Sequence, residues 1–304
     1  MNKVRHFKSL LDINKNEFIR IIKRSVEFKK ESHENILNNS LQNKTMAMIF
    51  KKNSTRTRVA FETAMVKLGG HAIFLSSDTT QITRGEDLAD TAKVLSGMVD
   101  IIMIRTHNHG EVEELANNSS VPIINGLTEK YHPCQLLADM QTYHEERGSI
   151  EGKTVAWIGD GCNMCNSYIN AAKILNFKLK ISTPSGFEPD HKTLMLAKDN
   201  VELCDLPGQA VEDCDLVTTD VWTSMGDESE YEKRKQLFKG YQINQSLFDK
   251  AKSDAIFLHC LPAHRGEEVD ADVIDGPRSR VWQQAHNRLF TSKALIEFLL
   301  NESK

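Results

Sequence analysis

Short apolar runs alternate along the chain with longer segments in which apolar residues recur at helical spacing. In the first half, apolar runs that predict buried strands lie at 45–50, 72–75, 99–104 and 121–124, and helical patterns lie at 19–30, 55–68, 88–98 and 133–146. The second half continues with strands predicted at 154–159, 178–182, 216–221 and 255–259 and helices at 163–175, 189–198 and 243–252. Strands that alternate with helices indicate parallel sheets covered by helices on both faces.

This pattern predicts an α/β protein with two doubly wound parallel-sheet domains joined by helices. The expected domains are 1–147 and 148–284, because Gly148 and Gly152 bracket a break in the pattern. A last helical pattern covers 282–300, and we expect the helix 285–304 to pack back on the first domain.

Composition narrows the class of protein. With 304 residues, two domains are the natural expectation. Charged residues make up 26% and the net charge is −4, which argues against disorder and against a protein that grips nucleic acid non-specifically. No apolar run has the length of a membrane-spanning helix, and the N-terminal residues lack the apolar core of a secretory signal. The six scattered cysteines suit reduced thiols, so we expect a cytoplasmic protein with no membrane or nucleic-acid partner.

Ligands of parallel α/β sheets bind beyond the carboxyl ends of the strands, so the loops there are the expected positions of a binding site. The first loop holds Ser54-Thr55-Arg56-Thr57-Arg58. Ser54 can cap the following helix, and free backbone N–H groups, hydroxyls and a guanidinium together suit a phosphate. The alternative is a capped helix start with solvated arginines, in which Arg58 pairs with Glu62. The two interpretations are compatible if Arg56 contacts a ligand and Arg58 stabilises the helix.

Two further loops of the first half are candidates. Arg105 ends a buried strand and needs an anionic partner, either a ligand or a structural carboxylate. His107 and His109 follow it, but two histidines without a third ligand predict surface loop residues rather than a metal site. His132 and Gln135 flank the first turn of a helix that starts at Pro133, where both can bond a small amide or simply cap the helix.

The first loop of the second half is Gly159-Asp160-Gly161-Cys162-Asn163. It follows a strand and opens a helix as a dinucleotide-binding turn does, but Met164 stands where the third glycine of G-x-G-x-x-G belongs. A nicotinamide-dependent dehydrogenase is therefore one alternative. Cys162 and Cys165 form C-x-x-C without a second pair, which disfavours zinc and leaves a redox pair as a weaker alternative.

Two later strands also end in ionisable groups. Asp220 begins a loop that runs through Ser224-Met225-Gly226, and His259-Cys260-Leu261-Pro262 follows the last predicted strand. A Cys–His nucleophile at Cys260 is an alternative, but adjacent residues of a strand are expected to point to opposite faces.

Together these loops resemble the ornithine carbamoyltransferases of the aspartate/ornithine carbamoyltransferase family over essentially the whole chain. The S-T-R-T and H-P-x-Q motifs at 54–57 and 132–135 are similar to those of all carbamoyltransferases. The D-x-x-x-S-M-G and H-C-L-P motifs at 220–226 and 259–262 resemble the ornithine type. One departure is Cys162, which stands where many relatives have Asn, although Asn163 is kept.

The resemblance implies two binding sites and no metal or organic cofactor. It assigns carbamoyl phosphate to Ser54, Thr55, Arg56, Thr57, Gln81, Arg105, His132, Gln135, Cys260, Leu261 and Arg288. It assigns ornithine to Asn163, Asp220, Ser224 and Met225, and catalysis to Arg56, Arg105, His132 and Cys260. It also implies a homo-oligomer, a trimer or a multiple of trimers, whose active sites are shared because Gln81 reaches in from the neighbouring subunit.

The residues suit this chemistry. Arginines and a helix N-terminus can stabilise phosphate as a leaving group. The δ-amine of ornithine must lose a proton, which costs about 4.6 kcal/mol at pH 7 for an amine like that of lysine, and an arginine-rich, desolvated site lowers this cost. Asp220 suits the α-ammonium of a free amino acid, which disfavours putrescine or an acylated ornithine as the amine. The presence of Arg56, His132, Cys260 and Arg288 disfavours a non-catalytic binding protein. A catabolic direction of the reaction stays open.

Overall fold

The computed structural model describes residues 4–76, 86–223 and 231–303, which fold as two compact units. Unit 1 comprises residues 1–141 and 286–304, and unit 2 comprises residues 142–285. The chain passes from one unit to the other inside helix α5 (Pro133–Arg147) and again inside helix α12 (Val281–Glu302). The first boundary therefore falls within a helix, slightly before the glycine-flanked break considered from the sequence.

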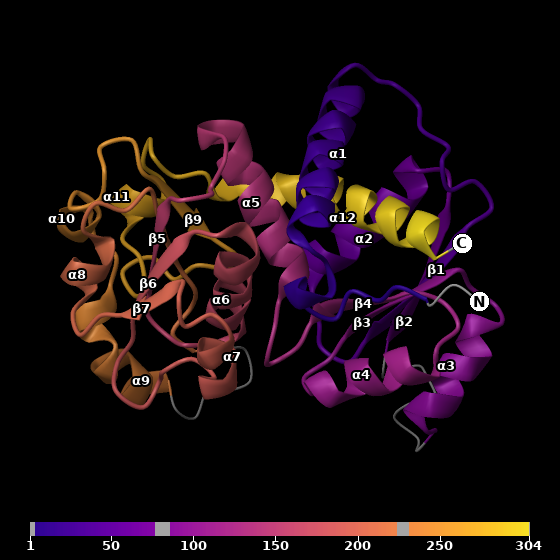
Figure 1. Cartoon of the computed structure of the whole chain (residues 1–304), viewed down its shortest axis with the longest axis horizontal. Helices are drawn as coiled ribbons and strands as arrows, with labels where there is room; N and C mark the ends of the chain where they lie inside the picture. The colour runs from indigo at the N-terminus through magenta and orange to yellow at the C-terminus, as the bar shows by residue number, and fades with distance from the viewer. Residues whose placement is uncertain (1–3, 77–85, 224–230, 304) are drawn as a thin grey trace. The chain divides into compact units, whose positions relative to one another are not determined.

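Unit 1 is built on a four-stranded parallel sheet in the order β2-β1-β3-β4. Its strands are β1 (Thr45–Phe50), β2 (His71–Ser76), β3 (Ile101–Arg105) and β4 (Ile123–Leu127). Its helices, besides its parts of α5 and α12, are η1 (Leu10–Asp12), α1 (Lys15–His33), α2 (Thr55–Lys67), α3 (Leu88–Ser96) and α4 (His109–Asn118). Figure 1 shows α3 and α4 on one side of this sheet and α2 and α12 on the other.

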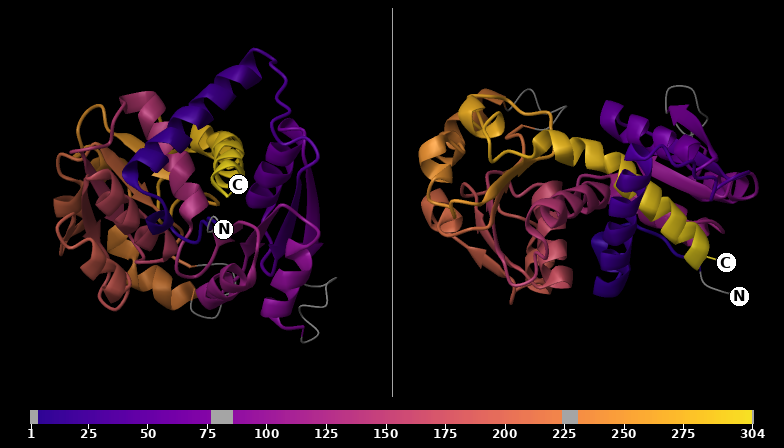
Figure 2. Two further views of the ribbon diagram at one scale, coloured as in Figure 1. Left: turned by 45° about the vertical axis from the view of Figure 1, so that its right-hand side comes forward. Right: turned by 90° about the horizontal axis from the view of Figure 1, so that it is seen from above.

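Alternation along the strands explains these two layers. Ala47, Ile49, Ile102 and Ile104 join one buried cluster with apolar residues of α3 and α4. The intervening positions, such as Met48 and Met103, are also fully buried and face the opposite layer. On that side α12, yellow in Figures 1 and 2, packs against α1, where Arg24 Nε donates to Glu297 Oε1 over 2.8 Å.

Unit 2 is built on a five-stranded parallel sheet in the order β7-β6-β5-β8-β9. Its strands are β5 (Thr154–Ile158), β6 (Lys178–Ser182), β7 (Val201–Leu203), β8 (Leu216–Thr219) and β9 (Ile256–His259). Its helices are α6 (Asn163–Leu175), α7 (His191–Leu196), α8 (Pro207–Val211), α9 (Tyr231–Leu237), η5 (Lys239–Tyr241), α10 (Gln245–Phe248) and α11 (Ala271–Ile274). Trp157 packs on Tyr168 of α6, whereas Ala156 and Ile158 join the apolar cluster of α8, α10 and α11 on the other face.

The predicted α/β class with two parallel sheets is confirmed. The extents of β1, β6 and α6 match the prediction, while β3 and β4 begin two residues later than predicted and α7 and α10 are shorter. Pattern reasoning missed β7, whose three residues are too few to show periodicity. It also placed His109 in a surface loop, which is wrong: Asn108 caps α4, so His109 opens this helix and is buried.

The two sheets start with the same clamp. In unit 1 the carboxylate of Asp100, just before β3, accepts hydrogen bonds from Thr45 N over 2.8 Å and from Lys44 Nζ over 2.6 Å. In unit 2 the carboxylate of Asp215, just before β8, accepts from Thr154 N over 2.9 Å and from Lys252 Nζ over 2.8 Å. In both units the aspartate therefore fixes the start of two adjacent strands, β1 and β3 in unit 1 and β5 and β8 in unit 2, whose other ends carry candidate site residues.

Candidate active site

In both sheets, most of the candidate residues lie where the strand order reverses. In unit 1 the chain runs from β1 outward to β2 and then returns to β3 on the other side of β1, so the order reverses between β1 and β3. In unit 2 it reverses in the same way between β5 and β8. Crevices at such reversal points bind the ligands of open α/β sheets. The loops after β1 and β3, and those after β5 and β8, carry most of the predicted residues.

The loop after β1 forms the expected helix start. Ser54 has an extended backbone and its side chain accepts from Thr57 N over 3.3 Å, so it caps α2 as predicted. Arg56 lies exposed in the first turn of α2, beside the remaining backbone N–H groups of that turn. Arg58 pairs with Glu62 over 3.1 Å and stacks on Phe74. The predicted structural role of Arg58 is thereby confirmed.

Two buried guanidinium groups meet at Thr57. Arg105 Nη1 donates to Thr57 Oγ1 over 3.4 Å from the end of β3, and Arg288 Nη2 donates to the same oxygen over 2.8 Å from α12. All three side chains are at most 6% exposed. Positive charge is thus concentrated beside the N-terminus of α2, whose dipole has the same sign. Charge of this kind attracts a phosphate group.

His132 lies in the same positive field. Burial, and then the charges of Arg288, Arg105 and Arg56, hold the pKa of its imidazole well below the usual value. His132 is therefore neutral at pH 7 and can donate a hydrogen bond without carrying charge.

Gln135 belongs to the first turn of α5. Its Nε2 donates to Asp139 Oδ1 over 2.9 Å, so it bonds forward along the helix and not back to the cap. Its Oε1 is buried and has no hydrogen-bond partner among the described residues. An NH₂ donor of a small ligand would satisfy this oxygen.

In unit 2 the candidate residues lie at the ends of β5, β8 and β9. Asn163 is the first residue of α6, and Asp220 follows β8. The Asp220 carboxylate accepts from Val221 N over 2.8 Å and from Cys260 Sγ over 3.1 Å through Oδ1, and from Cys162 Sγ over 3.7 Å through Oδ2. A carboxylate with this support suits a cationic ligand group.

The turn after β5 does not suit a dinucleotide. Gly161 N donates to Phe187 O over 2.8 Å, and a Cβ at Gly161 would lie 2.3 Å from Pro189 N. The chain itself thus fills the approach that a pyrophosphate needs. A redox role for Cys162 and Cys165 is disfavoured too, because burial, followed by nearby carboxylates, raises the pKa of both thiols well above the usual value.

The loop after β9 is held by His259. The Nδ1 atom of His259 accepts from Leu261 N over 2.9 Å, and Leu261 adopts the left-handed backbone region with φ 58°. The proton of the ring therefore sits on Nε2, which lies 3.2 Å from Oε1 of the fully buried Glu268. This pair fixes a backbone conformation that a leucine rarely adopts.

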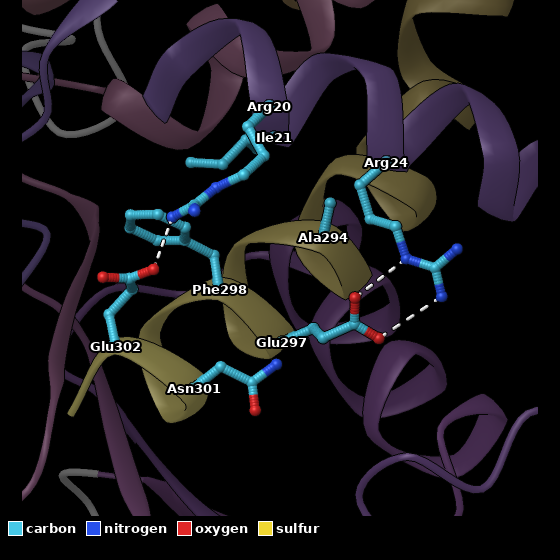
Figure 3. A pocket seen from close by; sticks show the side chains of 8 residues that line it. All are labelled: Arg20, Ile21, Arg24, Ala294, Glu297, Phe298, Asn301 and Glu302. Carbon is cyan, nitrogen blue, oxygen red and sulfur yellow. Dashed lines mark hydrogen bonds and ion pairs between the residues drawn. The ribbon is translucent and has the colours of Figure 1, made fainter. Parts of the chain in front are cut away.

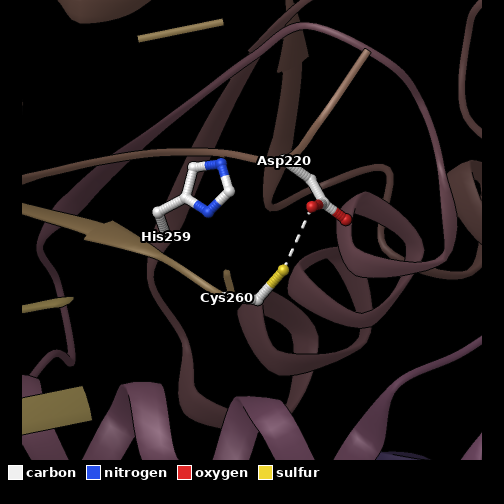
Figure 4. Close-up of side chains that lie close together, drawn as sticks. All are labelled: Asp220, His259 and Cys260. Carbon is white, nitrogen blue, oxygen red and sulfur yellow. Dashed lines mark hydrogen bonds between the residues drawn. The ribbon is translucent and has the colours of Figure 1, made fainter. Parts of the chain in front are cut away.

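Figure 4 shows the Cys260 thiol directed at Asp220, with the His259 ring beside both residues. A ring nitrogen of His259 lies within 4.8 Å of the sulfur and of a carboxylate oxygen. The expectation that His259 and Cys260 point to opposite faces is therefore wrong, because β9 ends at His259 and the chain turns there. The thiol donates to a carboxylate, which does not favour a nucleophilic role.

Two groups among the described residues have donor atoms close enough to hold a metal ion: Asp220, His259 and Cys260, and His264, Glu267 and Glu268. In the first group the donors are engaged in the hydrogen bonds given above. In the second, Glu267 already bonds Tyr231 and Lys235. Neither group includes His107 or His109.

A pocket of about 250 Å³ lies between α1 and α12 in unit 1 (Figure 3). Its two guanidinium groups are matched by carboxylates, Arg24 by Glu297 and Arg20 by Glu302. The charges of these two pairs cancel, so the pocket lacks the positive charge that a phosphate site needs.

Sequence reasoning missed several residues that hold the site. Arg234 of α9 bonds Asp160 and donates from Nε to Trp222 O over 2.5 Å, so it links the loops after β5 and β8. Its guanidinium also lies over the rings of Phe187 and Phe238. Glu268 was missed as well, since nothing near it in sequence marks a buried partner for His259. Three predicted residues, Gln81, Ser224 and Met225, lie outside the described residues.

Comparisons with known proteins cover nearly the whole chain. The profile of the aspartate/ornithine carbamoyltransferase carbamoyl-P binding domain matches residues 5–145, and that of the Asp/Orn binding domain matches residues 151–299. The chain belongs to the aspartate/ornithine carbamoyltransferase family. The resemblance seen in the sequence motifs is thereby confirmed.

Individual relatives cover nearly the full length of the chain. The ornithine carbamoyltransferase of Hydrogenovibrio crunogenus is 54% identical over 297 residues, which is 98% of each chain. The ornithine carbamoyltransferase structure from Pyrococcus furiosus is 46% identical with a TM-score of 0.94, covering 98% of this chain and 97% of that one. The structure from Burkholderia thailandensis is 47% identical with a TM-score of 0.92, covering 99% and 100%.

Proposed function

We propose that this ornithine carbamoyltransferase family member binds carbamoyl phosphate on unit 1 and L-ornithine on unit 2, and forms L-citrulline and phosphate in the direction of arginine biosynthesis. One observation supports the assignment of one substrate to each unit. The reversal point of the first sheet gathers buried guanidinium groups, and that of the second presents a carboxylate. The first charge complements a phosphate and the second an ammonium group.

On unit 1 we assign the phosphate to the N-terminus of α2 and to Arg56, Arg105 and Arg288. These positive groups stabilise phosphate as the leaving group. The neutral His132 donates to the carbamoyl oxygen, on which negative charge develops. The buried Oε1 of Gln135 accepts from the carbamoyl NH₂. A further role of the Cys260 and Leu261 carbonyls toward this NH₂ stays a prediction.

On unit 2 we assign the α-ammonium of ornithine to Asp220 and its α-carboxylate to Asn163 at the N-terminus of α6. These two contacts orient the amino acid, so that its δ-amine is presented as the nucleophile. The rate enhancement then comes mainly from positioning and electrostatics, and no covalent intermediate on Cys260 is required.

A panel of amines tests this assignment. We expect kcat/KM for ureido product formation to be at least about 100-fold higher with L-ornithine than with putrescine, which lacks the α-carboxylate, or N-acetylornithine, which lacks the α-ammonium charge. Equal or faster carbamoylation of putrescine would overturn the roles of Asp220 and Asn163. Separate measurement of the forward and reverse reactions at cellular substrate ratios tests the direction.

The proposed assembly is a homotrimer, or a multiple of trimers, with shared active sites. Its support is a set of exposed apolar side chains in unit 1: Val59 and Val66 of α2, Ile73 of β2, Val94 of α3 and Met98 just after α3, between 42% and 74% exposed. Association with further copies of this chain would cover them.

Complementation tests the shared site. Arg56→Gly and Gln81→Ala variants, each inactive and folded, are mixed, denatured and refolded together. Each mixed trimer then contains one interface between an intact Arg56 and an intact Gln81, so activity should return to one site per mixed trimer. Mixed trimers that are identified by native mass spectrometry and stay inactive would place Gln81 outside the neighbour's site.

None of the described helices is both long and apolar enough to cross a bilayer. A cytoplasmic location remains a prediction from the thiol content.

A further inference from the structure

The Asp220 carboxylate is held from three sides. Oδ1 receives the Val221 backbone N–H and the Cys260 thiol, which leaves Oδ2 to the Cys162 thiol at 3.7 Å. The two cysteines come from different elements, the loop after β9 and the start of α6. The two thiols thus fix the rotation of one carboxylate about its side-chain bonds.

Cys162 occupies an unusual position for a cysteine. It is the N-cap of α6, where Ser, Thr, Asp and Asn are preferred because their oxygens accept from the first turn. Its side chain makes no capping hydrogen bond of regular geometry and is directed instead at Asp220. The raised pKa of this thiol, due first to burial and then to the Asp220 charge, keeps it protonated as a donor.

We propose that Cys162 is a positioning residue for the amino-acid substrate: its thiol orients the Asp220 carboxylate toward the α-ammonium of ornithine. The inference rests on the proposed role of Asp220. An ion pair between ammonium and carboxylate has its full strength only when the oxygen lone pairs face the donors. Loss of the Cys162 contact leaves Oδ2 without this donor, so the carboxylate rotates more freely about Oδ1. Ornithine binding must then order the carboxylate again, which costs binding free energy.

A merely structural role for Cys162 makes a different prediction. If the side chain only packs the start of α6, its replacement disturbs Asn163 and the loop as a whole, and every amine substrate is affected alike. If it acts through Asp220, only substrates with an α-ammonium are affected. Ornithine and 5-aminopentanoate separate these cases, because the second is ornithine without its α-amine.

Four variants provide the test. Cys162→Ala removes the donor. Cys162→Ser keeps a preferred N-cap, but its C–O bond is shorter than the C–S bond, so a hydroxyl there lies too far from Asp220 for a hydrogen bond, since the thiol itself is 3.7 Å away. Cys162→Asn restores a donor of sufficient reach. Cys165→Ala is the matched control, since it removes a buried thiol of the same helix that has no hydrogen bond to Asp220 among the described residues.

We expect KM for ornithine to rise about three- to ten-fold in Cys162→Ala and Cys162→Ser, the effect of losing one hydrogen bond that supports a charged group. The KM for carbamoyl phosphate should change less than about two-fold. The same limit applies to 5-aminopentanoate, measured by kcat/KM if it is a substrate or by its inhibition constant if it is an inhibitor. Cys162→Asn and Cys165→Ala should keep the parent KM for ornithine within the same limit.

Three results decide the matter. Parallel losses with ornithine and 5-aminopentanoate, or an unchanged ornithine KM in both Cys162→Ala and Cys162→Ser, would overturn the inference. An Asp220→Asn variant measured beside them separates the two levels of the argument. If it leaves ornithine binding unchanged, the proposed role of Asp220 fails; if it weakens ornithine binding while the Cys162 variants do not, only the positioning role fails.

Discussion

The reversal points of the two sheets share one backbone plan and carry opposite charge. In each unit an aspartate clamps the starts of two adjacent strands, and the loops at their far ends lie where the strand order reverses. In unit 1 these loops and α12 gather Arg56, Arg105 and Arg288. In unit 2 they gather Asp220 and two thiols. Similar scaffolds can therefore serve a phosphate or an amino acid, depending on a few side chains beyond the strand ends.

The same difference appears in the titration of the neighbouring groups. In unit 1 burial and the arginine charges lower the pKa of His132, and in unit 2 burial and carboxylates raise the pKa of Cys162. Both groups are kept neutral, first by burial and then by neighbouring charges of opposite sign in the two units. Each site thus concentrates one charge and surrounds it with uncharged donors.

The largest expected effect on activity comes from removing a charged side chain from the site of one unit while the site of the other unit is left intact. Arg56→Gly should lower kcat by about 100-fold or more, because a donor to the developing phosphate charge is lost, with little change in KM for ornithine. Asp220→Asn should instead weaken ornithine and leave carbamoyl phosphate binding unchanged. Steady-state kinetics with each substrate varied in turn check both. The same changes in kcat and in the two KM values in both variants would contradict the assignment of carbamoyl phosphate to unit 1 and ornithine to unit 2.

The two clamps should differ in stability. Asp215→Asn should lower the free energy of unfolding by about 2–3 kcal/mol, and Asp100→Asn by about 1 kcal/mol or less, since a hydrogen bond to a charged group contributes more where water is excluded. The reason is exposure: the side chain of Asp215 is 3% exposed and that of Asp100 is 28% exposed. Urea denaturation compares the two variants, and equal losses would show that burial does not set their strength.

A pH effect on stability is expected from His132. Its folded pKa is lowered, so below about pH 6.5 the unfolded chain binds one more proton at this site than the folded chain. The stability from the neutral imidazole is present above that pH and falls by up to about 1.4 kcal/mol per unit as the pH decreases. Urea denaturation between pH 7.5 and 5 should show a shallower loss for His132→Gln than for the parent protein. Parallel curves would mean that His132 titrates normally.

The smallest expected effect belongs to Cys260. A hydroxyl in Cys260→Ser is still a donor near Asp220, and the backbone carbonyl is unchanged, so activity should fall only a few-fold. Complete inactivation, or a carbamoyl adduct detected on this cysteine by mass spectrometry, would show that the thiol is a nucleophile.

Much of the fold was readable because several strands, such as β1, are buried on both faces. Thr45–Phe50 stands out as a short apolar segment, Lys178–Ser182 alternates polar and apolar residues, and Ser54 marks a helix start by its cap. Helix α4 could also have been found, since Val112, Leu115 and Ala116 are buried at helical spacing after the Asn108 cap. The edge strand β7 could not, because a three-residue strand with exposed side chains leaves no pattern.

The sequence by itself determined the α/β class, the order of most strands and helices, and the residue types at the strand ends, because these depend on local periodicity and on short motifs. Only the tertiary structure decided which of them meet. Thr57, Arg105 and Arg288 are far apart along the chain, and so are Cys162, Asp220 and Cys260. Their contacts arise because parallel strands bring distant loops to one edge of a sheet, and the charges, burial and neutral donors of the site follow from that convergence and not from any local pattern.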